Sequence, residues 1–376
     1  MARTGASTGA PTARESGGAA STVAADYFRS PPGPGRRPAR YLAGIGRCDA
    51  RFLGWPDGPR PEDPRQDDRA VKALVTGAAG FVGRYLVDHL VAEGDEVGVT
   101  DRSNGGPDLL DPEGLTALLA EHRPEVVFHL AGQADVARSW TAPTETLRTN
   151  AEGTHHLLSA ARTAGADRVV TVTSADVYGV VRPEDLPLDE AAPFRPASPY
   201  AASKAMADLV AQQAHLGHGQ DVVRARSFNH FGPGQGDAGV CSALAARIAT
   251  CEAKGADTIP VGNLEARRDF TDVRDVVRAY RLLATHGRAG RAYNVCSGRA
   301  VAISEVLDVL LSLADRPIRA VDDPDLHRPV DLPELRGDPT AIHVDTGWKP
   351  TLDMASTLGE VLEDRRRRLT DSQTAD

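Results

Sequence analysis

The sequence predicts an α/β fold, in which a doubly wound parallel sheet is followed by a smaller, mixed α/β C-terminal lobe. Two observations lead to this fold class. From Val71 onward, short apolar segments alternate with amphipathic helical segments, as expected for parallel strands that helices cover on both faces. A glycine-rich turn also joins the first apolar segment to the first helical one, a feature of open sheets that bind nucleotides.

The strands and helices are expected in regular order. Apolar runs predict strands over residues 71–76, 95–101, 124–131, 167–174 and 220–227. Apolar residues at intervals of three and four predict helices over residues 80–94, 112–122, 144–165 and from Tyr200 onward. We therefore expect a Rossmann-type domain over residues 71–230. Beyond it the rhythm becomes irregular, which predicts a lobe over residues 231–370 that mainly binds the substrate.

Residues 1–70 differ from the rest of the chain. They are rich in Gly, Pro, Arg, Ser and Ala and show no apolar periodicity, so they bury too little apolar surface to offset the entropy lost on ordering. We expect this N-terminal extension to be disordered. An alternative is that the native protein starts at Val71, where the sequence opens directly into its first strand.

Composition and charge argue against several classes of partner. The 376 residues carry a formal net charge of −9, which argues against nucleic acid. No apolar run is long enough to span a bilayer, so no membrane association is expected. The four cysteines form no C-x-x-C pair and no cluster with histidine, which predicts no metal site and a location in the reducing cytoplasm.

The turn between the first strand and the first helix has the spacing of a dinucleotide site. Gly77, Gly80 and Gly83 allow a tight turn and a close approach of the backbone to a pyrophosphate. Phe81 and Val82 open the helix whose N-terminus would face that anion. A glycine turn needed only for packing is the alternative, but the strand before it and the helix after it favour NAD or NADP.

Asp101 ends the second predicted strand, about two dozen residues after the first glycine. A carboxylate at this position hydrogen-bonds the adenosine ribose hydroxyls and repels a 2′-phosphate, so it favours NAD over NADP. The adjacent Arg102 softens this preference. Asp108 and Leu109 follow with a polar–apolar pattern that fits the border of an adenine ring.

Tyr200 and Lys204 are expected to share one helix face, because four residues make about one helical turn. A cation beside a phenol lowers the phenol pKa from its usual value of about 10, which makes Tyr200 a proton donor or acceptor near neutral pH. Ser174 ends the fourth predicted strand, at the carboxyl edge of the sheet. A tyrosine followed by a lysine four residues later is also a common surface pair, so the spacing alone does not decide.

Several motifs in combination resemble one known family. They are TGAAGFVG, HLAGQADV, NAEGT, TSADVYG, YAASK, FNHFGPGQ, RRDFTDVRD and RPVDLPELRGDPTAIHVDTGWKP. From Val71 onward the chain is similar to the extended short-chain dehydrogenase/reductase, or NAD-dependent epimerase/dehydratase, family, which acts on nucleotide-sugars. It most resembles the branch that contains GDP-mannose 4,6-dehydratase and GDP-4-keto-6-deoxy-mannose reductase.

The resemblance implies catalytic roles for four residues. Tyr200 would protonate the alkoxide formed when hydride reaches a C4 ketone, and Ser174 would hydrogen-bond the same oxygen. Lys204 would hold the nicotinamide ribose. Asp176 stands where the dehydratases carry a glutamate that removes the C5 proton. Because aspartate is one methylene shorter, this position favours the reductase and leaves the dehydratase open.

Further cofactor contacts are implied after the third strand and in the next helix. These positions are Leu130, Ala131, Gln133 and Asn150. Asn150 would support the catalytic helix or a proton-relay water. A hydrogen bond within its own helix is the alternative.

The resemblance assigns the nucleotide of the substrate to the C-terminal half. Asn229 matches an asparagine that contacts the substrate, and Val240 matches a position that packs on the nucleobase. Arg268 and Arg328 match arginines that bind the diphosphate, as guanidinium groups bind phosphate oxygens bidentately. Asp331 matches an acidic residue that contacts the ribose. A GDP-linked sugar is the expected substrate.

One position departs from the dehydratase pattern. Ala243 stands where that pattern has a lysine, and the missing phosphate contact leaves the nucleotide open. Family members often pair through the helices that follow the third and fourth strands. The resemblance therefore implies a homodimer or homotetramer.

Three functions remain open at this point. The first is reduction of the C4 ketone of a GDP-4-keto-6-deoxy-hexose with NAD(P)H. The second is a 4,6-dehydratase or 4-epimerase that recycles a bound NAD. The third is a cofactor-binding regulator without catalysis, and the presence of Ser174, Tyr200 and Lys204 together argues against it.

Overall fold

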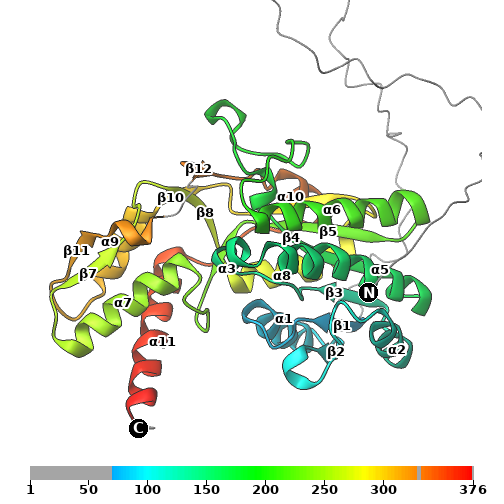
Figure 1. The fold of residues 1–376 in the computed structure, drawn as a ribbon, viewed down its shortest axis with the longest axis horizontal. Helices are drawn as coiled ribbons and strands as arrows, with labels where there is room; N and C mark the ends of the chain where they lie inside the picture. The colour runs from blue at the N-terminus through cyan, green and yellow to red at the C-terminus, as the bar shows by residue number, and fades with distance from the viewer. Residues whose placement is uncertain (1–69, 328–331, 375–376) are drawn as a thin grey trace, which may run out of the picture. The chain divides into compact units, whose positions relative to one another are not determined.

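A six-stranded parallel sheet forms the centre of the structure and confirms the predicted fold class (Figure 1). The computed structural model describes residues 70–327 and 332–374, so the predictions for residues 1–69 lie outside the described part. The strands are β1 (Lys72–Thr76), β2 (Glu96–Thr100), β3 (Val126–His129), β4 (Arg168–Ser174), β5 (Val222–Ser227) and β9 (Ala292–Val295). They lie in the order β2-β1-β3-β4-β5-β9, and all neighbours are parallel.

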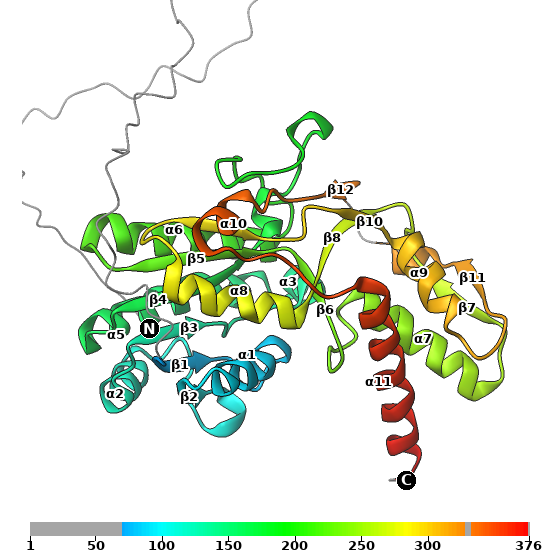
Figure 2. The same cartoon turned by 180° about the vertical axis from the view of Figure 1, so that it is seen from behind.

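Helices cover both faces of this sheet, as the nearly continuous apolar character of its inner strands requires. One core contains residues of α1 (Phe81–Ala92), α8 (Val273–His286) and α10 (Thr340–Thr346). The other contains residues of α2 (Pro112–His122), α5 (Gly153–Ala164) and α6 (Pro199–His218). Figures 1 and 2 show these two layers from opposite sides.

Shorter helical segments lie between the main elements. They are η2 (Arg102–Asn104), α3 (Val136–Thr141), α4 (Pro143–Leu147), η3 (Arg148–Glu152), η4 (Ala175–Tyr178) and η5 (Pro183–Asp185). The helix predicted over residues 144–165 is therefore three segments, because the π-helical turn η3 separates α4 from α5.

The chain changes direction across the sheet between β1 and β3, because β2 lies on one side of β1 and the later strands lie on the other. Backbone and side-chain bonds hold the two strand ends together here. The N–H of Leu130 donates to the carbonyl oxygen of Thr76 (3.3 Å), and the N–H of Ala131 donates to Thr76 Oγ1 (3.2 Å). Open parallel sheets bind ligands at such a switch point.

A second core lies in the C-terminal part of the chain. Its strands are β6 (Asn229–Phe231), β7 (Thr258–Val261), β8 (Arg267–Asp272), β10 (Ala300–Ala302), β11 (Arg319–Asp322) and β12 (Glu334–Leu335). β8 pairs with β6, β10 and β12, and β7 pairs with β11. The remaining elements are α7 (Val240–Lys254), α9 (Ile303–Ser312), η6 (Pro324–Leu326) and α11 (Met354–Thr374), and the three α-helices pack their apolar residues into this core.

Part of the chain after residue 231 returns to the central sheet. Helices α8 and α10 contribute to one of its cores, and β9 forms its last strand. An ion pair between Arg281 Nε and Asp95 Oδ2 (2.9 Å) also ties α8 to the start of β2. The expected division at residue 230 stays a prediction.

Within the described ranges, no helix is both long and apolar enough to cross a membrane.

Candidate active site

The glycine turn after β1 has no room for side chains. Gly77 has a φ of 72°, and a Cβ atom on it would lie 2.7 Å from the backbone nitrogen of Ala131. A Cβ atom on Gly83 would lie 2.2 Å from the carbonyl oxygen of Gly77. Gly80 is the N-cap of α1 and adds no side chain to its first turn. The first-turn N–H groups, which a helix leaves without intrahelical partners, therefore fit the pyrophosphate of a dinucleotide.

Asp101 stays ionised beside this turn. Burial opposes its charge, but hydrogen bonds from Ser103 and from the backbone of Ala79, together with the charge of Arg102, hold its pKa below the ordinary value. Ser103 donates to the carboxylate through its N–H (2.9 Å) and its hydroxyl (2.8 Å). Arg102 forms an exposed ion pair with Asp108 (3.2 Å). Asp101, which is expected to bind the adenosine ribose, and Arg102, which is expected to soften the preference for NAD, are therefore both available beside the glycine turn.

The other expected cofactor residues lie at different depths. Phe81 and Val82 in the first turn of α1 are half-buried, as are Leu130 and Ala131 after β3. Leu109 is only 8% exposed and packs with α2 and α5 in the core. Its role beside an adenine ring stays a prediction.

Asn150 connects the loop after β3 to helix α6. It lies in the π-helical turn and is almost fully buried. Its Oδ1 accepts from the N–H of Gln133 (2.8 Å), and its Nδ2 donates to the carbonyl oxygen of Gln133 (2.9 Å) and to Ser203 Oγ (2.8 Å). Among the three possibilities considered for Asn150, these bonds favour support of the helix that carries Tyr200 and Lys204.

Helix α6 presents Tyr200 and Lys204 on one buried face. Ser198 caps the helix, accepting a hydrogen bond from its first turn (3.1 Å), and Pro199 is the first helical residue. Tyr200 is 9% exposed and Lys204 is 8% exposed. Ser174, at the end of β4, lies close enough to the Tyr200 phenol to lower its pKa. The structure thus brings the serine and the tyrosine together at the carboxyl edge of the sheet.

The protonation of these groups differs from the expectation. Burial raises the pKa of the Tyr200 phenol, the charge of Asp176 raises it further, and the neighbouring Ser174 hydroxyl lowers it. Burial lowers the pKa of Lys204 to about 8. The Lys204 ammonium donates a hydrogen bond to the carbonyl oxygen of Val172 (3.1 Å). The expected lowering of the phenol pKa by Lys204 is therefore wrong, because burial of the phenol outweighs its neighbours.

His129 is a hydrogen-bonded histidine of the buried core. It is buried at the end of β3, where Nδ1 bonds Thr76 Oγ1 (3.0 Å) and Nε2 bonds Thr154 Oγ1 (3.1 Å). Burial and the nearby charge of Lys204 lower its pKa to about 3. The imidazole therefore stays neutral near pH 7, and both of its nitrogens are used in the core.

Asp176 lies close to the serine and the tyrosine. It is half-buried in η4, and its N–H donates to Ser174 Oγ (3.1 Å). Its charge acts on the pKa of Tyr200. A carboxylate here can serve as a base toward a substrate bound at the same edge, as the dehydratase alternative requires.

A cavity of about 210 Å³ in the C-terminal part includes three of the expected substrate residues. Asn229 begins β6, Val240 begins α7 and Arg268 lies on β8. The Nη1 of Arg268 donates to the carbonyl oxygen of Leu332 (2.7 Å), which fixes its guanidinium. Ala243, where the dehydratase pattern has a lysine, also lines this cavity.

Some residues that line this cavity are missing from the prediction, and two of the predicted substrate residues lie outside the described part. Asp237, Arg247 and Asn263 line the same cavity, but no local spacing in the sequence connects them. Arg328 and Asp331 lie outside the described residues, and their roles stay predictions.

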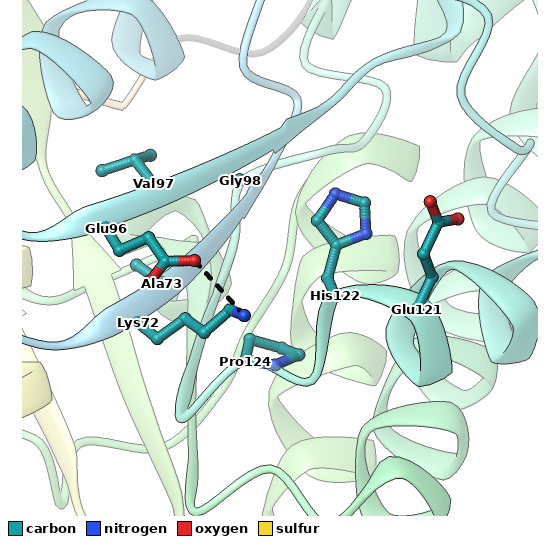
Figure 3. A pocket seen from close by; sticks show the side chains of 8 residues that line it. All are labelled: Lys72, Ala73, Glu96, Val97, Gly98, Glu121, His122 and Pro124. Atoms are coloured by element: carbon teal, nitrogen blue, oxygen red, sulfur yellow. Dashed lines mark ion pairs between the residues drawn. The ribbon is translucent and has the colours of Figure 1, made fainter.

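A second cavity, of about 270 Å³, has a different place in the fold (Figure 3). It is lined by the first residues of β1 and β2 and by the end of α2, including His122. Lys72 and Glu96 form an ion pair across it (3.2 Å). Because it lies at the amino ends of these strands, it is separate from the edge that carries Ser174.

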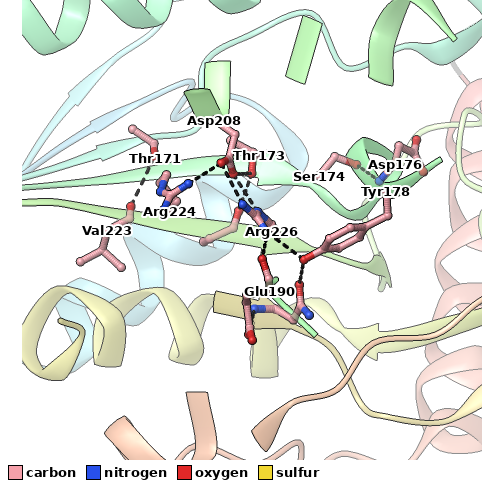
Figure 4. Close-up of polar contacts among 12 residues, drawn as sticks. Thr171, Thr173, Ser174, Asp176, Tyr178, Glu190, Asp208, Val223, Arg224 and Arg226 are labelled. Carbon is pink, nitrogen blue, oxygen red and sulfur yellow. Dashed lines mark hydrogen bonds and ion pairs between the residues drawn. The ribbon is translucent and has the colours of Figure 1, made fainter. Parts of the chain in front are cut away.

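A buried charge cluster under the site is absent from the sequence prediction. Asp208 of α6 bonds Arg224 and Arg226 of β5, and Arg226 also contacts Tyr178 (Figure 4). Two arginines within a largely apolar strand are a signal for such a cluster, since a buried charge needs a partner.

In the residues that the structure describes, no group of three or more histidine, cysteine or acidic side chains has the arrangement of a metal site.

Comparisons with known proteins agree with this geometry. A model of the NAD dependent epimerase/dehydratase family matches residues 73–296. GDP-6-deoxy-D-mannose reductase of Pseudomonas aeruginosa is 37% identical over 300 residues, which cover 79% of this chain and 98% of that protein. UDP-glucose 4-epimerase of Mycolicibacterium smegmatis is 34% identical over 322 residues, covering 78% and 98%.

A solved structure extends the likeness to the fold. The structure of RMD from Pseudomonas aeruginosa complexed with NADPH is 36% identical, covers 80% of this chain and 98% of its own, and has a TM-score of 0.73. With the family match spanning more than half of the chain, the conclusion is direct. This chain belongs to the NAD dependent epimerase/dehydratase family.

Proposed function

We propose that the protein is an NAD(P)-dependent reductase that converts the C4 ketone of a GDP-4-keto-6-deoxy-hexose to an alcohol. The observation that carries this proposal is the convergence of Ser174 and Tyr200 at the carboxyl edge of the sheet, with Lys204 one helical turn away. The likeness to a GDP-6-deoxy-D-mannose reductase over most of both chains supports the choice of reaction.

Tyr200, Ser174 and Lys204 have different roles in the proposed ketone reduction. A nicotinamide cofactor bound at this edge would supply the hydride for the C4 carbon. Tyr200, whose raised pKa keeps the phenol protonated, donates a proton to the developing alkoxide. Ser174 donates a hydrogen bond to the same oxygen, where negative charge grows. Lys204, protonated below about pH 8, holds the nicotinamide ribose hydroxyls.

Asp101 supports NAD(H) as the preferred cofactor. Its carboxylate is ionised beside the glycine turn, where it can accept from ribose hydroxyls and repel a 2′-phosphate. The RMD structure complexed with NADPH and the exposed Arg102 next to Asp101 support use of NADP(H) as well. We therefore propose both cofactors, with NAD(H) preferred.

The cavity lined by Asn229, Val240 and Arg268 supports a nucleoside diphosphate as the carrier of the sugar. Val240 offers an apolar surface to a base, and the Arg268 guanidinium suits a diphosphate. The GDP-linked form rests on the likeness to the reductase. The roles of Arg328 and Asp331 at this nucleotide are part of the same proposal.

A 4,6-dehydratase or 4-epimerase is the second candidate. Asp176 keeps the dehydratase open, because its carboxylate lies close enough to Tyr200 to act on the pKa of the phenol. The likeness to a UDP-glucose 4-epimerase favours the epimerase. A regulator without catalysis is a third candidate, and a Tyr200→Phe variant that leaves the cellular role intact would support it.

The reaction is tested by incubating the purified protein with a GDP-4-keto-6-deoxy-hexose and either NADH or NADPH, and by separating the nucleotide-sugars. Absorbance at 340 nm should fall in proportion to the 6-deoxy product formed. A parallel incubation with GDP-mannose alone should give no product. Conversion of GDP-mannose to a 4-keto-6-deoxy product without any net change at 340 nm would instead identify a dehydratase, and conversion to an epimer would identify an epimerase.

We also propose a cytoplasmic homodimer, in which α5 and α6 pair with those of a second copy. Met206, Leu209 and Leu216 are exposed on α6 by 47%, 53% and 70%, and apolar side chains gathered on one helix favour an interface. A homotetramer would need a second surface. Cys241, Cys251 and Cys296 are free thiols, which suits a reducing compartment.

A further inference from the structure

Arg226 joins the two segments that carry the proposed catalytic groups. We infer that it is a positioning residue, which holds α6 and the loop after β4 in the register that Tyr200 and Ser174 require. The inference rests on the proposed function, because it assumes that these two side chains act on the substrate. Arg226 itself is only 4% exposed.

Asp208 supplies the attachment on the helix. Tyr200, Lys204 and Asp208 follow each other at intervals of four residues, so they lie along one face of α6. Asp208 is fully buried. Its Oδ2 accepts a hydrogen bond from Thr173 Oγ1 (3.2 Å), and Thr173 immediately precedes Ser174 on β4. The helix face that carries the phenol is thus bonded to the strand end that carries the serine.

The Arg226 guanidinium divides its hydrogen bonds between the helix and the loop (Figure 4). Nε and Nη2 donate to the two carboxylate oxygens of Asp208, at 2.9 and 3.0 Å. Nη1 donates to Tyr178 Oη (3.0 Å) and to the carbonyl oxygen of Glu190 (2.8 Å). Tyr178 ends η4, the short turn that begins directly after Ser174.

Tyr178, the contact of Arg226 in the loop after β4, is itself held in place by a further hydrogen bond. Tyr178 Oη donates to Asn294 Oδ1 on β9 (2.6 Å), and the tyrosine is fully buried. The guanidinium lies 4.7 Å above the Phe194 ring. The planar guanidinium of arginine can donate hydrogen bonds to α6 and to the loop after β4 at the same time. A lysine ammonium has one charged centre and cannot reproduce that geometry.

Ion pairs of Asp208 with Arg226 and Arg224 hold the cluster together. Burial opposes ionisation of Asp208, but its hydrogen bonds to Arg226 and Arg224 and their charges hold its pKa below the ordinary value. The same pair raises the pKa of Arg226 against the effect of burial. Because a buried ion left without its partner is costly, the cluster resists separation of α6 from the strand end.

Arg224 provides a matched comparison within the same cluster. It lies two residues earlier on β5, is 6% exposed, and bonds Asp208 Oδ1 at 2.6 Å. Its Nη2 donates to the carbonyl oxygen of Gly290 (2.9 Å), so its second contact lies outside the η4 loop. A purely structural role for the cluster predicts equal effects at both arginines. A positioning role predicts an effect on turnover at Arg226 alone.

The test compares Arg226→Lys with Arg224→Lys in steady-state reduction of the keto-sugar. Both variants should unfold at lower temperature than the wild type. Arg226→Lys should lower kcat between about 10- and 100-fold, as expected when reacting groups shift by about 1 Å, with KM within about twofold. Arg224→Lys should keep kcat within about twofold. Equal kcat values in the two variants would overturn the inference.

A second variant covers the case in which Arg226→Lys does not fold. Tyr178→Phe leaves the ion pair with Asp208 in place and removes the hydroxyl that the guanidinium contacts in η4, together with its hydrogen bond to Asn294. It should lower kcat about tenfold with little change in KM, and an unchanged kcat would overturn the inference. If the wild type does not reduce the keto-sugar, the proposed function fails. If it does so and these variants match it, only the positioning role fails.

Discussion

Asn150 Nδ2 donates a hydrogen bond of 2.8 Å to Ser203 Oγ, and thereby joins the π-helical turn before α5 to helix α6, which carries Tyr200 and Lys204. Ser203 is fully buried and precedes Lys204 directly. The same amide pairs in both directions with the backbone of Gln133. One side chain therefore holds the β3 loop and the catalytic helix together.

Replacing Asn150 with alanine should destabilise the protein. The change leaves the Ser203 hydroxyl and the Gln133 backbone without these partners, and each buried group left unsatisfied costs about 1–3 kcal/mol. Urea unfolding should show a free energy of unfolding lower by at least that amount. Thr163→Ala, which removes an exposed hydroxyl of α5 bonded only within its helix, is the control and should change the value by less than about 0.5 kcal/mol.

Tyr200→Phe should abolish ketone reduction while cofactor binding persists. Loss of the proton donor should lower kcat by about 10²- to 10⁴-fold, and the Kd for NADH should stay within about twofold. Tyr293→Phe is the control, because Tyr293 is also buried but bonds Asp345 on the far side of the sheet. Full turnover by the phenylalanine variant at position 200 would show that another group donates the proton.

The pH dependence of kcat/KM should report Lys204. Burial lowers its pKa to about 8, so the ammonium is present below that pH and is lost as the pH rises through it. Since kcat/KM reports ionisations of the free enzyme, it should fall above about pH 8. The raised pKa of Tyr200 keeps the phenol protonated over the same range. In the Lys204→Met variant, the residual kcat/KM should not fall above about pH 8. If it still falls, a group other than Lys204 causes the pH dependence.

Asp101→Asn should shift cofactor preference toward NADPH. The amide keeps the side-chain shape but removes the charge that repels a 2′-phosphate. The ratio of the Kd for NADPH to the Kd for NADH should fall about tenfold, equivalent to about 1.4 kcal/mol, in fluorescence titrations. Arg102→Gln should move the ratio in the opposite direction, and an unchanged ratio in both variants would remove these residues from cofactor selection.

The dimer should dissociate when charge is placed on the exposed face of α6. We expect light scattering to give the mass of two chains for the wild type and of one chain for the double variant Leu209→Glu/Leu216→Glu. Leu352→Glu, at a leucine that is 43% exposed elsewhere, should leave the mass unchanged. A wild-type protein with the mass of one chain would contradict the proposed pairing.

The central sheet is predictable because its signals are local. The apolar runs that became β1 to β5, and the glycine turn after β1, each lie within a few neighbouring residues. Helices α7 and α11 are not predicted. The polar run Arg365–Arg368 hides the apolar stripe of α11, in which only residues such as Leu358 and Leu362 reach the core.

Within the candidate site, sequence reasoning reaches the residues that follow motifs and misses those defined by packing. It identifies Tyr200 and Lys204, but it assigns the wrong direction to the phenol pKa, because the extent of burial depends on the whole fold. It also misses Asp208, whose partner Arg226 lies 18 residues away on another element. Their pairing is set by the packing of α6 on β5, which no spacing along the chain expresses.

The order of elements along the chain has a consequence for synthesis on the ribosome. Strands β6 to β8 and helix α7 are translated after β5 but before β9, which completes the sheet beside β5. A nascent chain that ends near residue 230 therefore exposes the backbone edge of β5 to other molecules. Truncation there should yield an aggregation-prone fragment.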